Sequence, residues 1–149
     1  MAVKPVPEGY HTVVPYIVAA DAEALLTFLT SGLKAREQEV MRYPDGKIWH
    51  GDVVIGNSHV MLSQATERHP AMPCTLYLYV PDTDAAYRDA LAAGAISLME
   101  PANQFYGDRN AGVQDSNGNC WYFGTHVEDV APGEMRRRHA EEVRKRQHQ

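Results

Sequence analysis

An internal repeat is the feature of this sequence that most restricts the folds open to it. The second half can be laid over the first at an offset of 61 to 62 residues, although the identities are few. The matched positions are Val18 with Val80, Ala24 with Ala86, Leu29 with Leu91, Gly32 with Gly94, and Gly56-Asn57 with Gly118-Asn119. A half-size unit with one open apolar sheet face must bury that face against a partner. The repeat therefore predicts two similar units that share one core.

The first unit, residues 10–63, has the pattern of a strand, a helix and three further strands. Asp21 is a typical N-cap, the apolar residues behind it recur at helical spacing, and Gly32 is placed to end the helix. Pro15 interrupts the first strand, which suits an edge or barrel strand better than a central one. Strands are predicted at 12–18, 35–43, 47–55 and 58–63, with short turns between the last three.

The second unit, residues 74–126, repeats this order after a proline-containing linker at 64–73. Asp82 and Gly94 bound its helix, and strands are predicted at 75–80, 96–99, 109–115 and 120–125. Asp115 is predicted to shape the tight turn at 115–119 rather than to act as a catalyst. We therefore expect an α+β fold in a single domain, residues 1–131, followed by a basic tail at 132–149 that can form a helix.

Charge and cysteine usage limit the partners of the chain. The formal net charge is −5, with +3 in the tail and −8 in the body that precedes it. Nucleic acids and anionic membranes are bound through clustered Lys and Arg, so we expect neither as a partner. The acidic body favours a cationic small molecule, although solubility alone also accounts for it. Two isolated cysteines and an N-terminus without an apolar signal run predict a reduced, cytoplasmic protein.

Several short motifs follow one another in a characteristic order. They are Val80-Pro81-Asp82-Thr83-Asp84-Ala85, Ala92-Ala93-Gly94-Ala95, Glu100-Pro101, Tyr106-Gly107-Asp108-Arg109 and Asp115-Ser116-Asn117-Gly118-Asn119-Cys120-Trp121. On these motifs, and over about 13–126, the chain resembles the vicinal oxygen chelate superfamily, within it the glyoxalase/bleomycin-resistance/dioxygenase-like group. Ser116 stands where that group more often has proline. The resemblance implies two βαβββ modules that form a curved mixed sheet around a cleft, with the helices outside, usually in a homodimer.

Enzymes of the resembled group hold a divalent metal in this cleft with His, Glu or Gln side chains from the first and last strands of each module. In this sequence the resemblance places Val13 or Val14, Met61, Thr75 and Tyr122 at those positions. None of these side chains is a conventional ligand for a divalent metal. We therefore expect no metal and no other cofactor.

Histidines elsewhere offer an alternative metal site. His11 and His59 share strand parity with Val13 and Met61, and His50 lies on a central strand. No HxH or HExxH spacing supports convergence of the three, so a hydrogen-bonded or surface role is expected for each histidine.

Aromatic residues near the predicted cleft are the positive signal for ligand binding. Tyrosines that alternate inward along the strands would give a largely apolar pocket with a few polar tips, which suits an organic ligand. Trp121 and Phe123 have the opposite parity and are expected in the core. Arg109 is either a clamp for an anionic group or one half of an ion pair that fixes its loop. The predicted ligand-binding residues are Trp49, His50, His59, Met61, Thr75, Tyr77, Tyr106, Arg109 and Tyr122.

The sequence thus favours a non-catalytic protein that binds a small organic compound, such as an antibiotic, in clefts of a homodimer. The alternative is a metal-dependent lyase, isomerase or dioxygenase with relocated histidine ligands. A metal-free enzyme that uses Tyr122 or Arg109 is a third hypothesis.

Overall fold

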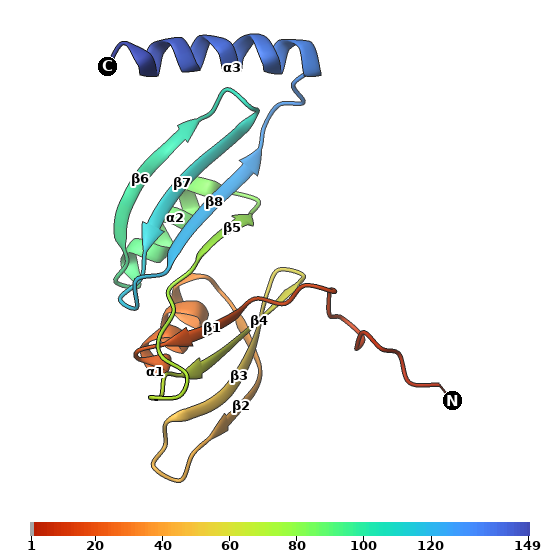
Figure 1. Ribbon diagram of the computed structural model, residues 1–149, viewed down its shortest axis with the longest axis vertical. Coiled ribbons are helices and arrows are strands. Elements are labelled where there is room, and N and C mark those ends of the chain that lie inside the picture. Colours follow the sequence, from red (N-terminus) through yellow and green to blue (C-terminus); the bar gives the residue numbers. More distant parts are fainter. Residues whose placement is uncertain (1) are drawn as a thin grey trace.

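Each half of the chain forms a four-stranded sheet with a helix on one face in the computed structural model, which describes residues 2–149 (Figure 1). The first module has the strand order β1-β4-β3-β2 and the second β5-β8-β7-β6. The first and last strands of each module are parallel, and the other pairs are antiparallel. This is the α+β fold of paired βαβββ modules that the sequence predicts.

The elements follow one another in the order expected from the repeat. Those of the first module are β1 (Tyr16–Ala19), α1 (Ala22–Thr27), the π-helical turn η1 (Phe28–Gly32), β2 (Arg36–Arg42), β3 (Ile48–Ile55) and β4 (Ser58–Gln64). Those of the second module are β5 (Thr75–Tyr79), α2 (Thr83–Ala92), β6 (Ile96–Asn103), β7 (Asp108–Gln114) and β8 (Cys120–His126). Helix α3 (Pro132–Gln147) follows at the far end of the second module (Figure 1).

The predicted helix caps are present in both modules. The Asp21 carboxylate accepts a hydrogen bond from the backbone N–H of Ala24, and the Asp82 carboxylate accepts one from that of Ala85. Each bond satisfies a donor that the first helical turn leaves free, so the two aspartates fix where α1 and α2 begin.

Two strand boundaries differ from the sequence prediction by more than one residue. Strand β1 begins at Tyr16 rather than at residue 12, and the preceding Pro15 contributes only its carbonyl, which accepts from the Met61 N–H at 2.9 Å. Strand β6 continues past residue 99 to Asn103 and includes Pro101. An edge strand tolerates proline, and a register shift between Met99 and Ala102 accommodates it.

The core lies between the sheets and their helices and continues from one module to the other. Trp121 and Phe123 are buried, as their strand parity predicts. The Trp121 ring lies 6.3 Å from the ring of Phe28 in η1, measured between centroids. Gly32 permits a second close approach between the modules, because a Cβ there would come within 2.8 Å of the Cβ of Ala93.

The turn between β7 and β8 is organised by Asp115. One carboxylate oxygen accepts from the backbone N–H groups of Asn117 and Asn119, and the other accepts from the Asn119 side chain and the Trp121 indole at 3.0 and 2.8 Å. Asn117 in turn bonds the backbone N–H and carbonyl of Asp21. The turn therefore connects the second module to the start of α1.

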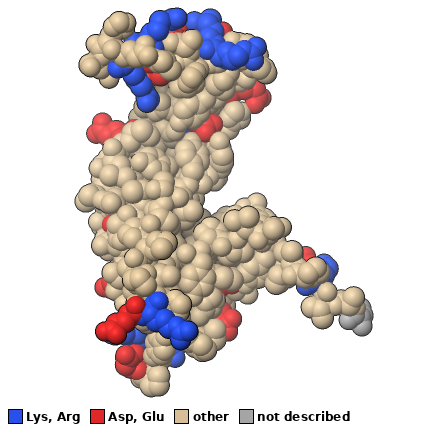
Figure 2. Space-filling view, in the orientation of Figure 1, with Lys and Arg blue, Asp and Glu red and all other residues tan. Residues whose placement is uncertain are grey.

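Helix α3 is held to the second module mainly through Arg138. Its guanidinium donates to the Phe105 carbonyl and to the Glu128 carboxylate. Figure 2 shows that Lys and Arg side chains gather at the end of the molecule where α3 lies. Within residues 2–149, no helix is long and apolar enough to cross a membrane.

Candidate functional site

The face of each sheet that its helix does not cover, called here the open face, carries the candidate site. On the open face of the second module, β5 and β8 place Tyr77 beside Tyr122. Tyr79 follows on β5, and its ring meets that of Tyr77 edge to face at 5.3 Å. Tyr77 is 43% exposed and Tyr79 69% exposed, so this aromatic surface is accessible to a ligand.

Two glycines let these rings lie close to the sheet. A Cβ at Gly112 would come within 2.6 Å of the Tyr122 ring, and a Cβ at Gly124 would overlap the Tyr77 side chain. The neighbouring strands β7 and β8 thus provide a gap under each ring. The rings lie against the sheet and form an aromatic surface, called here the aromatic floor.

Asp108 is the polar end of this floor. Although its side chain is almost fully buried, its carboxylate accepts from the hydroxyls of Tyr77 and Tyr79, both at 2.9 Å, and from Nδ1 of His126 at 3.1 Å. Burial alone would raise the pKa of Asp108, but these donors bring it below its ordinary value. The pKa of His126 is raised by its hydrogen bonds to Asp129 and Asp108.

The tyrosine hydroxyls at this end stay protonated. Burial raises the pKa of Tyr77 to about 12, with a further contribution from Asp108, and the hydrogen bond to Asp108 raises that of Tyr79. Groups with such pKa values are hydrogen-bond donors near neutral pH rather than bases or nucleophiles.

Asn110 lies next to Asp108 on the same open face. Its side-chain nitrogen donates to the hydroxyls of Tyr77 and Tyr106, at 3.3 and 2.5 Å. Within residues 2–149, its side-chain oxygen Oδ1 is buried without a hydrogen-bond partner. A buried polar atom of this kind is unfavourable unless a further group binds it.

The open face of the first module carries a second polar group. His59 on β4 donates from Nδ1 to Asp52 on β3 at 2.8 Å, and both side chains are buried. The ring of Tyr10 covers His59. A pocket of about 450 Å³ lies beside them, between the chain before β1 and Met61. Its lining residues are Pro5, Val6, Pro7, Tyr10, His11, Thr12, Val14 and Met61.

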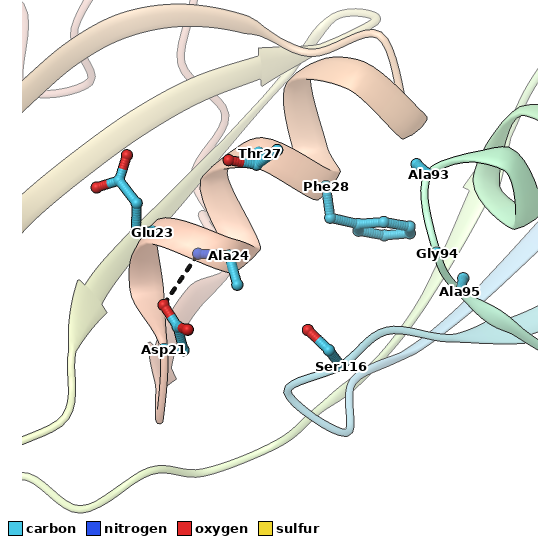
Figure 3. A pocket seen from close by; sticks show the side chains of 9 residues that line it. All are labelled: Asp21, Glu23, Ala24, Thr27, Phe28, Ala93, Gly94, Ala95 and Ser116. Carbon is cyan, nitrogen blue, oxygen red and sulfur yellow. Dashed lines mark hydrogen bonds between the residues drawn. The ribbon is translucent and has the colours of Figure 1, made fainter.

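A second pocket, of about 400 Å³, lies between the two modules on the helix side (Figure 3). The Phe28 ring points toward Ala93 and Gly94, and the Asp21 carboxylate is turned to the backbone of Ala24. The Asp21 carboxylate of this pocket therefore serves as a helix cap. We assign no ligand to this pocket.

The structure divides the predicted site residues into three groups. Thr75, Tyr77 and Tyr122 share the open face of the second module, with Tyr106 bonded to Asn110 beside them. His50, His59 and Met61 lie on the open face of the first module, where Nδ1 of His50 lies 3.5 Å from the Tyr16 hydroxyl.

Arg109 and Trp49 are not brought together with the others. Arg109 points to the helix side of its sheet, where it forms a bidentate pair with Asp84 of α2 at 2.7 and 2.9 Å. The ion pair is thus the observed role, of the two that the sequence left open. Trp49 is 56% exposed and packs against Tyr43, with ring centroids 6.4 Å apart.

Asp52, Asn110 and Tyr10 are site residues that the sequence reasoning missed, and it did not assign Asp108 to the ligand site. Strand parity could have found Asp52, which is two residues from His50, and Asn110, which is two residues from Asp108. Tyr10 lies in a segment without periodicity, so no sequence pattern indicates that it covers His59.

The side chains at the implied metal positions do not fit a divalent metal. Met61, Thr75 and Tyr122 lie on the strands, and Val13 is 81% exposed before β1. Across the described part of the chain, no three His, Cys, Asp or Glu side chains are grouped so that they could hold a metal ion. The polar groups of the open faces are phenols, an amide and carboxylates that already accept hydrogen bonds. Such groups suit hydrogen bonding to an organic molecule.

Comparisons with known proteins agree with this architecture. Residues 10–123 match the Glyoxalase/Bleomycin resistance protein/Dioxygenase superfamily. The uncharacterized protein Rv0887c of Mycobacterium tuberculosis (strain H37Rv) is 31% identical over 132 residues, which cover 81% of this chain and 78% of that protein.

Two solved structures share the fold at low sequence identity. TioX from Micromonospora sp. ML1 has a TM-score of 0.69 and 22% identity, and the match covers 78% of this chain and 99% of TioX. TnmS3, an antibiotic binding protein from Streptomyces sp. CB03234, has a TM-score of 0.63 and 19% identity, with 85% and 99% covered.

Proposed function

Because the chain belongs to the Glyoxalase/Bleomycin resistance protein/Dioxygenase superfamily, we propose that it binds a small organic molecule on the open faces of its sheets. The binding site lies in clefts of a homodimer, uses no metal, and sequesters its ligand in the cytoplasm without converting it. An antibiotic or a similar aromatic compound is the proposed ligand class, since TnmS3, which has this fold, is an antibiotic binding protein.

The aromatic floor of the second module is the observation that carries the proposal. Exposed tyrosine rings, one of them close over a glycine, offer a large aromatic contact surface at low entropic cost. Asp108 and Asn110 at its end provide fixed polar contacts that can orient a ligand.

The protonation of the site favours binding over catalysis. Asp108 already accepts three hydrogen bonds, and the hydroxyls of Tyr77 and Tyr79 are held protonated. A general base needs a pKa near the working pH, and the pKa values of these groups are shifted away from it.

A homodimer accounts for the exposed side chains that remain. Tyr16 and Ile96 are 51% and 61% exposed in the single chain. Exposed apolar surface of this kind is typical of interfaces and ligand sites. A second copy of the chain is the partner that we propose for it.

Calorimetry with metal-free protein tests the proposal. Protein treated with a chelator is titrated with a panel of glycopeptide and aromatic antibiotics, before and after a divalent metal is restored. We expect micromolar or tighter binding of at least one compound, unchanged by the metal and without turnover. Binding or turnover that requires a tightly held metal would contradict the proposal.

A further inference from the structure

The N-terminal arm, residues 2–15, places one aromatic ring on the open face of the first module. The ring of Tyr10 stacks on the imidazole of His59 with centroids 3.6 Å apart and planes inclined by 18°. The Tyr10 hydroxyl donates a hydrogen bond to Oδ2 of Asp52. The ring and the hydroxyl are therefore both recognised, each by a different side chain.

The seat beneath Tyr10 is built from two neighbouring strands. Asp52 is 4% exposed and His59 is 8% exposed. Their own hydrogen bond, at 2.8 Å, occupies the other carboxylate oxygen and fixes the plane of the imidazole. The seat thus presents a flat face for stacking and one acceptor at its edge.

The rest of the arm adds little that would hold Tyr10 in place. Residues 2–9 are exposed, and the backbone N–H of Tyr10 bonds within the arm, to the Pro7 carbonyl at 3.1 Å. A pocket of about 450 Å³ already lies between the arm and Met61. Segments with few buried contacts open at low free-energy cost, so Tyr10 is an exchangeable occupant of the seat.

We propose that Asp52 and His59 form a subsite for a phenolic ring of the ligand, and that Tyr10 occupies this subsite as an internal stand-in when no ligand is bound. This assignment rests on the proposed function, because it names the group that the first-module half of the cleft takes. The ligand class is a neutral hydroxylated aromatic compound, which stacks on His59 and donates its hydroxyl proton to a hydrogen bond with Asp52.

The protonation of Tyr10 agrees with this chemistry. The hydrogen bond to Asp52 raises the pKa of Tyr10 to about 12, with further contributions from burial and from the charges of Asp52 and Glu39. A phenol bound in the same seat faces the same carboxylates. It stays neutral and remains a donor.

Removal of Tyr10 and replacement by a free phenol tests the subsite. The probe is p-cresol, which is the tyrosine side chain without its backbone, and toluene is the matched compound that lacks the hydroxyl. Chemical-shift titration of the full-length Tyr10→Ala variant should show p-cresol binding at least tenfold more tightly than to the wild type. Toluene should bind this variant at least tenfold more weakly than p-cresol does.

Two further variants keep the test decisive. Tyr43→Ala removes an exposed tyrosine of the same module and should leave p-cresol affinity at the wild-type level. Tyr10→Phe keeps the ring and loses the donor, so its p-cresol affinity should lie between those of the wild type and Tyr10→Ala. This variant carries the comparison if the alanine variant does not fold.

Equal affinity of the alanine variant for toluene and p-cresol, or no p-cresol binding by either folded Tyr10 variant, would overturn the subsite. If the antibiotic panel still bound the metal-free wild type, the proposed function would stand and this assignment alone would fail. If the panel did not bind but p-cresol bound as expected, the subsite would stand and the proposed function would need another ligand.

Discussion

Gly112 shows at the scale of the residue how the backbone shapes the candidate site. Its missing side chain leaves the space in which the Tyr122 ring lies against β7. The sequence predicts Tyr122 on the inward face, because strand parity is a local pattern. It does not predict that the ring lies close over Gly112, since that depends on which residue the neighbouring strand brings beside it.

Gly112→Ala should therefore weaken both ligand binding and the fold. The new methyl group displaces the Tyr122 ring from the sheet, and we expect about a tenfold loss of affinity, with a stability loss of about 1–3 kcal/mol. Calorimetry and urea unfolding measure the two effects. Gly133→Ala in α3 is the matched control, where a Cβ meets only an arginine end at 3.8 Å. Equal effects of the two substitutions on affinity would contradict the role of the floor.

Asp108 makes the free energy of unfolding depend on pH. Its pKa is lowered in the folded state, so it contributes stability above its ordinary value of 3.8, and this contribution is lost as the pH falls through the folded pKa. Asp108→Asn should flatten the fall in unfolding free energy on acidification, measured by urea titration. Asn57→Ser, in an exposed turn, changes no ionisable group and should leave the acid slope unchanged. An unchanged slope for Asp108→Asn would show that this carboxyl is not stabilised by Tyr77, Tyr79 and His126.

At the scale of the element, the helix caps and most strands could be predicted because their signals are local. Asp21 and Asp82 precede apolar residues at helical spacing, and both cap a helix in the structure. The extension of β6 through Pro101 could not be predicted, since proline usually ends a strand and only its edge position permits it. The covering of His59 by Tyr10 depends on a contact between segments 49 residues apart, which no local pattern encodes.

The turn between β7 and β8 should be the most sensitive of the tight turns to substitution. Asp115 is buried and accepts four hydrogen bonds, so Asp115→Ala leaves the Trp121 indole N–H and the Asn119 side-chain nitrogen without an acceptor. We expect a loss of about 3 kcal/mol in the free energy of unfolding, measured by urea titration. Asp45→Ala is the matched control, because Asp45 is exposed and accepts one bond, from the Lys47 N–H at 2.9 Å. A similar, small loss for both variants would contradict the organising role of Asp115.

At the scale of the whole molecule, the repeat explains both the fold and its open faces. Tyr16 lies opposite Met61 in the first module, and Tyr77 lies opposite Tyr122 in the second, so the two sheets share one register. Each helix covers one face of its sheet, and the other face keeps its aromatic and polar residues available. The proposed homodimer brings these faces together as clefts for an organic ligand.

Native mass spectrometry of the metal-free protein with a bound aromatic antibiotic tests this account most directly, because one spectrum reports the oligomeric state, the ligand count and any retained metal. We predict a dimer that carries two ligand molecules and no metal ion. A protein that takes up the ligand only as a metal-loaded species, or only as a monomer, would contradict the account.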